Sequence, residues 1–194
     1  MIYLYGLSNK WNNAINLCPF TTKVELFLKI TKIKYEKNSN LFNVKTSPTG
    51  NVPWISHNDN KYAESDNIIG YLKYKFKVDP DNNLSLEQKM EAKLLKHLVE
   101  DNLNWVIKYL RYYFDDSYYI IENEIVGMYK YLTTDKRAEI INNCKMNGIG
   151  NMDVNLIIND AKFSLVLLSK KLGSSKYFLN QEKSQLLILL YFHF

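Results

Sequence analysis

Residues Ser47–Phe76 read SPTGNVPWISHNDNKYAESDNIIGYLKYKF, a pattern typical of two strands and a helix in succession. Ser47–Asn51 supplies a turn, and the run Val52–His57 predicts a strand. The Asn-Asp-Asn sequence that follows favours a tight turn before a brief strand at Lys61–Ala63. A helix is expected to begin near Ser65. The stretch therefore predicts a ββα unit.

The residues before this stretch predict the other half of a sheet. Met1–Tyr5 is β-branched and aromatic and predicts a strand, whereas Pro19–Thr31 carries apolar residues at nearly helical spacing. Ile33–Lys37 is a candidate for the next short strand. A strand–helix–strand unit of this kind has a right-handed crossover and parallel strands. The order βαβ then ββα predicts an α/β domain with a mixed four-stranded sheet over residues 1–76.

The rest of the chain predicts helices alone. The polar segment Lys77–Asn83 contains a proline and is interpreted as a linker, which leaves residues 84–194 as a helical domain. Ser85-Leu86-Glu87-Gln88 fits a capping box. A long helix is therefore expected from there to Phe114, with two apolar stripes that bury it on two sides.

Two further features belong to the last third of the chain. A helix is predicted over Asp153–Leu172, with Gly173 as its left-handed cap. The strongly apolar segment Leu186–Phe194 is about half of the ~20 residues needed to span a bilayer. A packed terminal helix is therefore favoured over a membrane anchor.

Composition narrows the classes of function. The chain has 194 residues, 46% of them hydrophobic and 23% charged, which is ordinary for a soluble globular protein. Its net charge of +5 comes almost wholly from scattered lysines, and Arg111 and Arg137 are the only arginines. Because phosphate recognition favours the planar guanidinium fork, a nucleic-acid partner is not expected.

The cysteines and histidines bear on the cellular setting and on metals. Cys18 and Cys144 lie far apart in the sequence and make no disulfide framework, which favours a reducing, cytoplasmic location. No secretory signal is visible, because no basic residue precedes the first apolar run. His57, His97 and His193 share no ligand spacing with the cysteines, so no metal site is expected.

Cys18 stands directly before Pro19 and Phe20, at the expected start of the first helix. Proline suits the first helical position because it has no amide proton to leave unpaired, and this places Cys18 at the N-cap. There the helix dipole and the open amides would lower the thiol pKa from ~8.5 toward neutrality. Two interpretations stay open, an inert buried cysteine and a redox-active thiol. Since Thr21 stands where a second thiol would be, any exchange would stop at a mixed disulfide.

Two more features complete a candidate site. Pro53 follows Val52 at the start of a strand, where a trans bond is commoner and a cis bond would turn the Val52 amide and carbonyl toward a peptide-like ligand. Glu64 and Ser65 open a helix, where ordinary capping and a carboxylate-and-ammonium site both explain them. Glutathione would use all these features, with its γ-glutamyl group at Glu64 and Ser65 and its backbone at Val52. Its sulfur would then face Cys18.

The segments CPFTTKVELFLKITKIKYE, SPTGNVPWI and ESDNIIGYLKYKF resemble the thioredoxin-like half of glutathione transferases. In the second half, LVEDNLNWVIKYLRYYF and GIGNMDVNLIINDAKFSLVLLSKKLGSSKYFLNQEK resemble the failed-axon-connections and metaxin-like branch. The resemblance implies a thioredoxin-like N-terminal domain and an all-α C-terminal domain of the glutathione-transferase type. Where the family continues with Pro-Thr and a helix-opening Asp, this chain has SQLLILLYFHF, which implies a truncated C-terminal domain.

The resemblance also assigns residues to the site. Cys18 falls where cysteine-type transferases of the omega sort hold their reactive thiol. By motif match the resemblance carries glutathione contacts onto Val52, Pro53, Glu64 and Ser65. Apart from the motif match, Phe20 and Lys45 are further expected contacts. The expected wall of the acceptor-substrate pocket is Tyr109 and Tyr112. Lys45 would reach the glycine carboxylate of glutathione, although an ordinary solvated lysine is the commoner case.

Two functions stay open. The first is a cytoplasmic glutathione-binding protein, a homodimer by family resemblance, in which Cys18 transfers thiols or carries out glutathione-dependent redox chemistry. Its second substrate would be an electrophile or a disulfide. The second is a non-catalytic interaction module of the failed-axon-connections and metaxin type. Its apolar terminal helix would dock onto a membrane complex at the mitochondrial outer-membrane surface.

Overall fold

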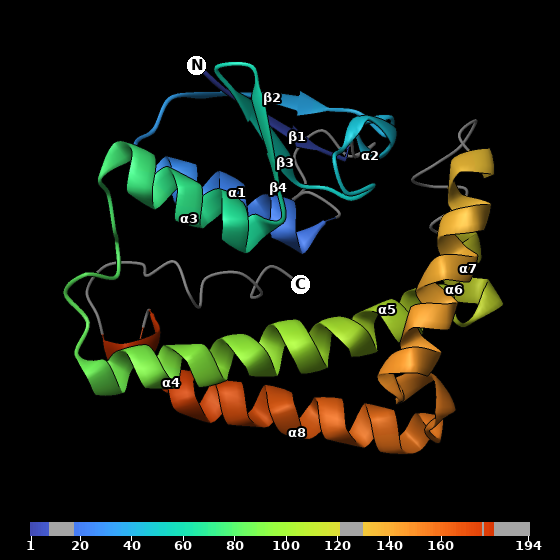
Figure 1. The fold of residues 1–194 in the computed structure, drawn as a ribbon. Helices are drawn as coiled ribbons and strands as arrows, with labels where there is room; N and C mark the ends of the chain where they lie inside the picture. The colour runs from blue at the N-terminus through green and yellow to red at the C-terminus, as the bar shows by residue number, and fades with distance from the viewer. Residues whose placement is uncertain (8–17, 121–129, 176, 181–194) are drawn as a thin grey trace. The chain divides into compact units, whose positions relative to one another are not determined.

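The structure is a computed structural model that describes residues 1–7, 18–120, 130–175 and 177–180 (Figure 1). The chain forms two compact units, with Met1–Lys89 in unit 1 and Met90–Asn180 in unit 2. The boundary between the units lies inside the first helix after the expected linker. The domain limits at residues 76 and 84 stay a prediction.

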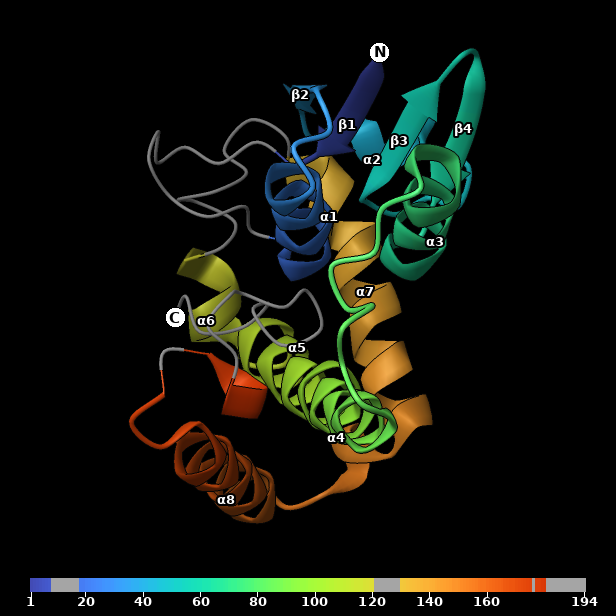
Figure 2. The ribbon, with the colours of Figure 1, turned by 90° about the vertical axis from the view of Figure 1, so that its left-hand side faces the viewer.

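Unit 1 is built around the predicted mixed sheet of four strands (Figure 2). These are β1 (Ile2–Gly6), β2 (Tyr35–Ser39), β3 (Trp54–His57) and β4 (Asn60–Ala63), in the spatial order β2-β1-β3-β4. β1 pairs in parallel with β2 and antiparallel with β3, and β3 pairs antiparallel with β4. Ile2 therefore lies between Tyr35 and His57. Toward the other end of β1, Tyr5 lies opposite Trp54.

β2 begins at Tyr35 rather than at Ile33 because the preceding turn belongs to the first helix. Helix α1 (Pro19–Ile30) is followed by Lys32, whose φ of 56° lies in the left-handed region. The Ile33 amide then donates to the Leu28 carbonyl at 3.0 Å. This amide closes the helix instead of joining the sheet, and the Ile33 side chain is buried in the core.

Helices α1 and α3 (Ser65–Phe76) pack side by side on one face of the sheet (Figure 1, Figure 2). Their apolar faces meet inward residues of β1 and β3, and the resulting core includes Leu4, Val24, Phe27, Leu28, Ile55, Ile68, Ile69 and Leu72. Burying one such side chain stabilises the fold by roughly 2 kcal/mol. This packing holds the first turns of both helices in one layer.

A four-residue helix, α2 (Asn43–Thr46), lies between β2 and β3 and was not predicted. The buried Asn43 side-chain amide donates to the Gly6 carbonyl at 2.8 Å and to the Asn38 carbonyl at 2.9 Å. The Trp54 indole N–H donates to the Asn43 carbonyl at 2.9 Å. Because a helix this short is unstable in isolation, these bonds to the sheet explain why it forms here.

The described residues of unit 2, and the segment that leads into them, form helices, as predicted. The elements are α4 (Leu86–His97), the π-helical turn η1 (Leu98–Leu103), α5 (Asn104–Tyr112), α6 (Asp115–Ile120), α7 (Lys130–Asn147), η4 (Ile149–Asn151), α8 (Val154–Leu172) and η5 (Phe178–Asn180). The predicted long helix therefore exists as α4, η1 and α5 in succession. A core of this unit contains Val106, Tyr109, Cys144 and Ile157.

The predicted helix termini differ in outcome. Ser85 and Gln88 form the predicted capping box, with the Gln88 amide donating to Ser85 Oγ at 3.2 Å and the Ser85 amide donating to Gln88 Oε1 at 3.0 Å. Gly173 ends α8, and its amide donates to the Ser169 carbonyl at 2.9 Å. Its φ of 56° is positive but its ψ is −132°, so the predicted left-handed cap is wrong. Glycine reaches this region because it has no side chain.

The prediction that the long helix is buried on two sides is wrong at its beginning. Leu86, Met90 and Leu94 are 69%, 61% and 71% exposed. Their spacing of four residues places all three on one face of α4. Ala92, on another face, is fully buried.

Within the described ranges, no helix combines the length and the apolar character that crossing a membrane requires. The expected terminal helix at Leu186–Phe194 lies outside the described residues.

Candidate functional site

Cys18 occupies the N-cap of α1, as predicted, and Pro19 is the first helical residue. The Cys18 backbone is extended, and its carbonyl accepts the amides of Thr21 and Thr22 at 3.1 and 3.3 Å. Its side chain is half-buried. The sulfur is thus held at the end of the helix where the dipole favours negative charge.

The Cys18 thiol donates a hydrogen bond to the Val52 carbonyl, with the sulfur and oxygen 3.4 Å apart. The Val52–Pro53 peptide bond is cis, so the cis alternative is confirmed. The thiol proton occupies one of the two lone pairs of the Val52 carbonyl, and its pairing with a peptide-like ligand stays a prediction. A thiolate has no proton to donate, so ionisation of Cys18 would open this carbonyl to another donor.

Glu64 and Ser65 form the beginning of α3. Glu64 is the N-cap, with φ 68° and ψ 125°, and it makes no side-chain capping hydrogen bond. A positive φ at a residue other than glycine costs of order 1–3 kcal/mol and is found preferentially at functional sites. Glu64 is exposed and Ser65 is 7% exposed. Glu64 therefore does not act as an ordinary side-chain cap, and the binding of a ligand by Glu64 and Ser65 stays a prediction.

An ion pair between a buried lysine and an exposed aspartate joins α1 to α3, and the sequence pattern did not predict it. Lys23 Nζ lies 2.6 Å from Asp66 Oδ1, with the Lys23 side chain 3% exposed and the Asp66 side chain 57% exposed. Lys23 lies three residues after Phe20 and four before Phe27, on the apolar face of α1. A lysine on the apolar face of a helix needs an anionic partner when it is buried, and this was the feature of the sequence that could have predicted the ion pair.

The remaining expected glutathione contacts lie on other parts of unit 1. Phe20 is half-buried in the first turn of α1, Pro53 is buried beside β3, and Lys45 is exposed on α2. The bond from Trp54 to Asn43 attaches α2 to β3, so Lys45 and Pro53 belong to elements that are held together. Their contact with glutathione stays a prediction.

Tyr109 and Tyr112 lie in α5 of unit 2. Tyr109 is 5% exposed, packs in the core with Cys144, and has its ring 4.6 Å from that of Tyr113. Burial, with smaller effects of neighbouring groups such as Tyr113, raises the pKa of Tyr109. The half-buried Tyr112 accepts a hydrogen bond from Arg137 Nε at its carbonyl, at 2.9 Å. The place of both tyrosines in an acceptor-substrate pocket stays a prediction.

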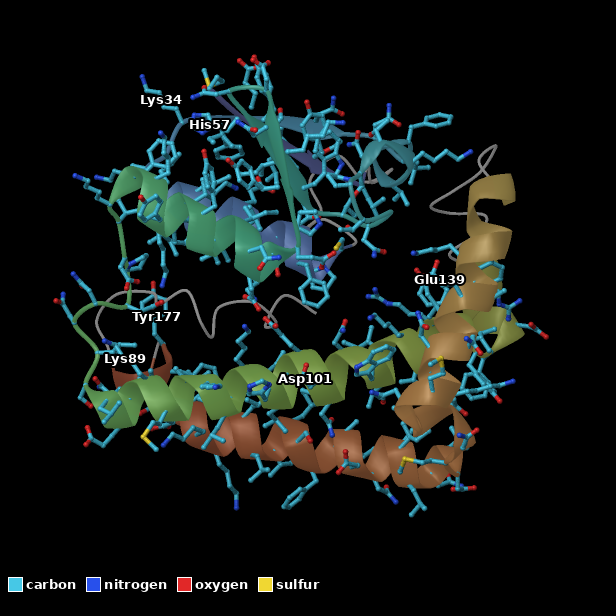
Figure 3. All side chains as sticks on the ribbon, viewed as in Figure 1. Lys34, His57, Lys89, Asp101, Glu139 and Tyr177 are labelled. Atoms are coloured by element: carbon cyan, nitrogen blue, oxygen red, sulfur yellow. The ribbon has the colours of Figure 1, made fainter. Side chains whose placement is uncertain are left out.

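A separate groove of about 520 Å³ lies at the His57 end of the sheet, away from Pro53. Lys34 and His57, both labelled in Figure 3, contribute to its lining. His57 Nδ1 lies 2.7 Å from the Tyr71 hydroxyl. Burial lowers the pKa of His57, and burial with a hydrogen bond to Tyr62 raises the pKa of Tyr71 to about 12. Because the groove lies at the His57 end of the sheet, it is distinct from the residues around Cys18.

Comparison with known families and proteins bears on both halves of the chain. A family model described as the glutathione S-transferase N-terminal domain matches residues 19–118. Isoprene-epoxide–glutathione S-transferase from Rhodococcus sp. (strain AD45) is 36% identical over 108 residues, which cover 54% of this chain and 45% of that protein. Failed axon connections from Drosophila melanogaster is 26% identical over 200 residues, covering 96% of this chain and 47% of that protein. The chain spans about half the length of these curated relatives.

Solved structures show the same fold. The crystal structure of a glutathione transferase from Phanerochaete chrysosporium matches with a TM-score of 0.64 at 14% identity, covering 96% of this chain and 79% of that one. A glutathione S-transferase from the Antarctic clam Laternula elliptica matches with a TM-score of 0.60 at 16% identity, covering 98% of this chain and 74% of that one. The predicted thioredoxin-like domain followed by a helical domain is confirmed.

Proposed function

The chain belongs to the glutathione S-transferase superfamily, and from that premise we propose that unit 1 binds glutathione at the first turns of α1 and α3 and uses Cys18 for thiol–disulfide exchange. The observation that carries the proposal is the 3.4 Å hydrogen bond between the Cys18 thiol and the Val52 carbonyl. It brings a sulfur at a helix N-terminus against the peptide group that precedes a cis proline. A peptide with a thiol is the ligand that suits both groups.

Each end of glutathione has a partner in this proposal. The exposed Glu64 carboxylate faces the γ-glutamyl ammonium, and the Ser65 hydroxyl with the open amides of α3 binds the γ-glutamyl carboxylate. Once Cys18 ionises, the Val52 carbonyl accepts a peptide N–H of glutathione in place of the thiol proton. Lys45 on α2 is the proposed partner of the glycine carboxylate.

The proposed reaction reduces a glutathione mixed disulfide, RS–SG. The Cys18 thiolate attacks the glutathionyl sulfur, the RS–SG bond breaks as the Cys18–SG bond forms, and the RS⁻ leaving group takes up a proton. The thiolate of a second glutathione then attacks Cys18–SG, which releases GSSG and restores the Cys18 thiolate. The mixed disulfide is the oxidant and glutathione is the reductant. Such exchange suits a reducing cytoplasm.

Conjugation of glutathione to an electrophile is the less favoured enzymatic variant. The name of the Rhodococcus relative states this chemistry for that protein, with isoprene epoxide as the electrophile. A cysteine thiolate beside the sulfur of a glutathione mixed disulfide attacks that sulfur and displaces the RS⁻ group, whereas conjugating enzymes need a group that only donates a hydrogen bond to the glutathione sulfur. Cys18 therefore favours exchange.

A second candidate function is that of a non-catalytic interaction module. The alignment with Failed axon connections, which covers 96% of this chain, is the observation that favours it. In this alternative the residues around Cys18 bind glutathione weakly or not at all. A membrane complex would then be the partner, as the metaxin resemblance suggests.

Retention on immobilised glutathione and a mixed-disulfide exchange assay test the proposal. We expect Glu64→Ala to abolish retention and Cys18→Ser to abolish exchange. Cys144→Ser is the matched control, since Cys144 is 1% exposed in the core of unit 2 and should leave both properties intact. Exchange that survives Cys18→Ser would rule out the mechanism. If the wild-type chain shows neither retention nor exchange, the interaction module is correct.

A further inference from the structure

We propose that Lys23 is a positioning residue that neutralises Asp66 and thereby lets the first turn of α3 accept the γ-glutamyl carboxylate. This inference rests on the proposed glutathione function. Lys23 Nζ lies 2.6 Å from Asp66 Oδ1. Asp66 directly follows Ser65 in the first turn of α3, and Lys23 lies five residues after Cys18 on α1. One ion pair thus joins the two helix ends that carry the site.

The pair is asymmetric in its exposure. The Lys23 side chain is 3% exposed, whereas the Asp66 side chain is 57% exposed. Removing an ammonium from water is costly, and apolar residues of similar size hold helices together as well as a buried ion pair does. Helix packing alone therefore does not require a lysine at this position. A lysine is required, however, if the charge of Asp66 at the surface has to be balanced.

The charge that needs balancing lies beside the proposed carboxylate subsite. The first-turn amides of α3 attract an anion, and the Asp66 carboxylate already stands in that turn. Without the positive charge of Lys23 beside it, this carboxylate would repel the incoming γ-glutamyl carboxylate more strongly. Lys23 cancels the Asp66 charge from inside the protein. The exposed Glu64, one residue before Ser65, is left to attract the γ-glutamyl ammonium.

Glutathione binding by the full chain, measured by calorimetry at low and at high salt, tests the inference. We expect Lys23→Met to weaken binding roughly fivefold to tenfold at low salt, because the Asp66 carboxylate then loses the positive charge of Lys23, and to weaken it less at high salt. The double variant Lys23→Met/Asp66→Asn should recover affinity to within about twofold of wild type, since no net charge remains to repel the ligand. A double variant that binds as weakly as Lys23→Met would show that the pair only holds the helices together.

Asp66→Asn gives a second measurement that does not depend on Lys23→Met folding well. Neutralising Asp66 while keeping Lys23 should leave glutathione affinity unchanged or higher, whereas a purely structural pair predicts weaker binding. Lys37→Met is the matched control, because it breaks another 2.6 Å ion pair of α1, to Glu25, and should leave affinity unchanged. Absence of glutathione binding by the wild type would overturn the proposed function and this inference with it. If the wild type binds glutathione but Asp66→Asn does not restore the affinity of Lys23→Met, the inference is wrong and the proposed function still stands.

Discussion

Lys23 and Glu25 lie two positions apart on α1, and each ties the helix to a different neighbour. Lys23 pairs with Asp66 on α3, and Glu25 accepts Lys37 of β2 at 2.6 Å. In the first pair the cation is buried and the anion exposed, whereas in the second the anion is the more buried partner, with its side chain 16% exposed. Single charged residues thus fix α1 on two sides of its apolar face.

The Glu25 pair predicts a pH-dependent effect on stability. Burial by itself raises the pKa of Glu25, but hydrogen bonds from Lys37 and Lys29 outweigh burial and hold the pKa below its ordinary value of 4.5. A lowered folded-state pKa stabilises the protein above the unfolded-state pKa, and this contribution is lost as pH falls through the folded-state pKa. We expect Glu25→Gln to lower the free energy of unfolding by about 1 kcal/mol at neutral pH. Urea unfolding at decreasing pH should show the difference from wild type shrinking.

The neighbouring Tyr35 gives an independent check on this prediction. Its hydroxyl donates to Glu25 Oε1 at 3.2 Å, and burial together with the charge of Glu25 raises the pKa of Tyr35 to about 12. Ultraviolet titration should show a lower Tyr35 pKa in Glu25→Gln, with Tyr35→Phe identifying the signal. A stability difference that stays constant with pH, together with an unchanged Tyr35 pKa, would contradict the assigned electrostatic role.

At the scale of elements, the short helices depend on contacts that their own residues cannot supply. α2 is held by bonds of Asn43 to β1 and the end of β2. η4 depends instead on the close approach of the Gly150 backbone to the backbone of α7. A Cβ on Gly150 would lie 2.8 Å from the Lys145 amide nitrogen and 3.0 Å from the Cys144 carbonyl carbon. Both neighbours are backbone atoms at the end of α7, so they cannot move aside as a flexible side chain could.

Gly150→Ala is therefore expected to lower the free energy of unfolding by roughly 1–3 kcal/mol, since the α7–η4 turn must shift to admit the methyl group. Gly70→Ala is the matched control. Gly70 lies within α3, with nothing within 4 Å of the added Cβ, so alanine should stabilise the helix by about 0.5–1 kcal/mol. Chemical denaturation of the two variants measures both effects. Equal changes in the two would show that close approach at Gly150 has no energetic weight.

At the scale of the whole molecule, large apolar residues gather on the exposed side of α8. Leu156, Phe163 and Leu167 are 59%, 62% and 44% exposed, at a spacing of seven and then four residues that places them on one face. Exposed apolar patches on soluble proteins mark association sites or aggregation liabilities. The expected homodimer therefore has one candidate surface here, and the stripe at Leu86, Met90 and Leu94 is another.

We expect the full chain to self-associate as its concentration rises, and Phe163→Ser/Leu167→Ser to shift this association to higher concentration. The physical reason is that the two substitutions remove much of the apolar area available for burial between copies. Light scattering coupled to gel filtration measures the mass at each concentration. Lys162→Ser, also exposed on α8, is the control for a polar change. An unchanged association curve in the double variant would exclude this face.

Most of the local structure was predictable from the sequence. β-branched and aromatic runs between turn residues predicted the sheet, and apolar residues at helical spacing predicted α1. Helices α3 and α8 were also predicted, and Pro19 predicted the position of Cys18 at the N-cap. The failures have local causes too. Ile33 belongs to the end of α1 rather than to a strand, and Met90 and Leu94 are apolar but exposed, since an apolar stripe does not tell which face a neighbour covers.

The spacing of apolar residues along the sequence could not predict which distant residues form contacts with each other. The Cys18–Val52 bond joins residues 34 positions apart, and the Lys23–Asp66 pair joins residues 43 positions apart. Periodicity reports which side of an element is buried, because that depends on the residues of the element alone. Which group meets which partner depends on how α1 and α3 pack against the sheet. A shared ligand had suggested that Cys18 and Val52 lie close together, but the bond between them and the Lys23–Asp66 pair became visible only once the elements were assembled.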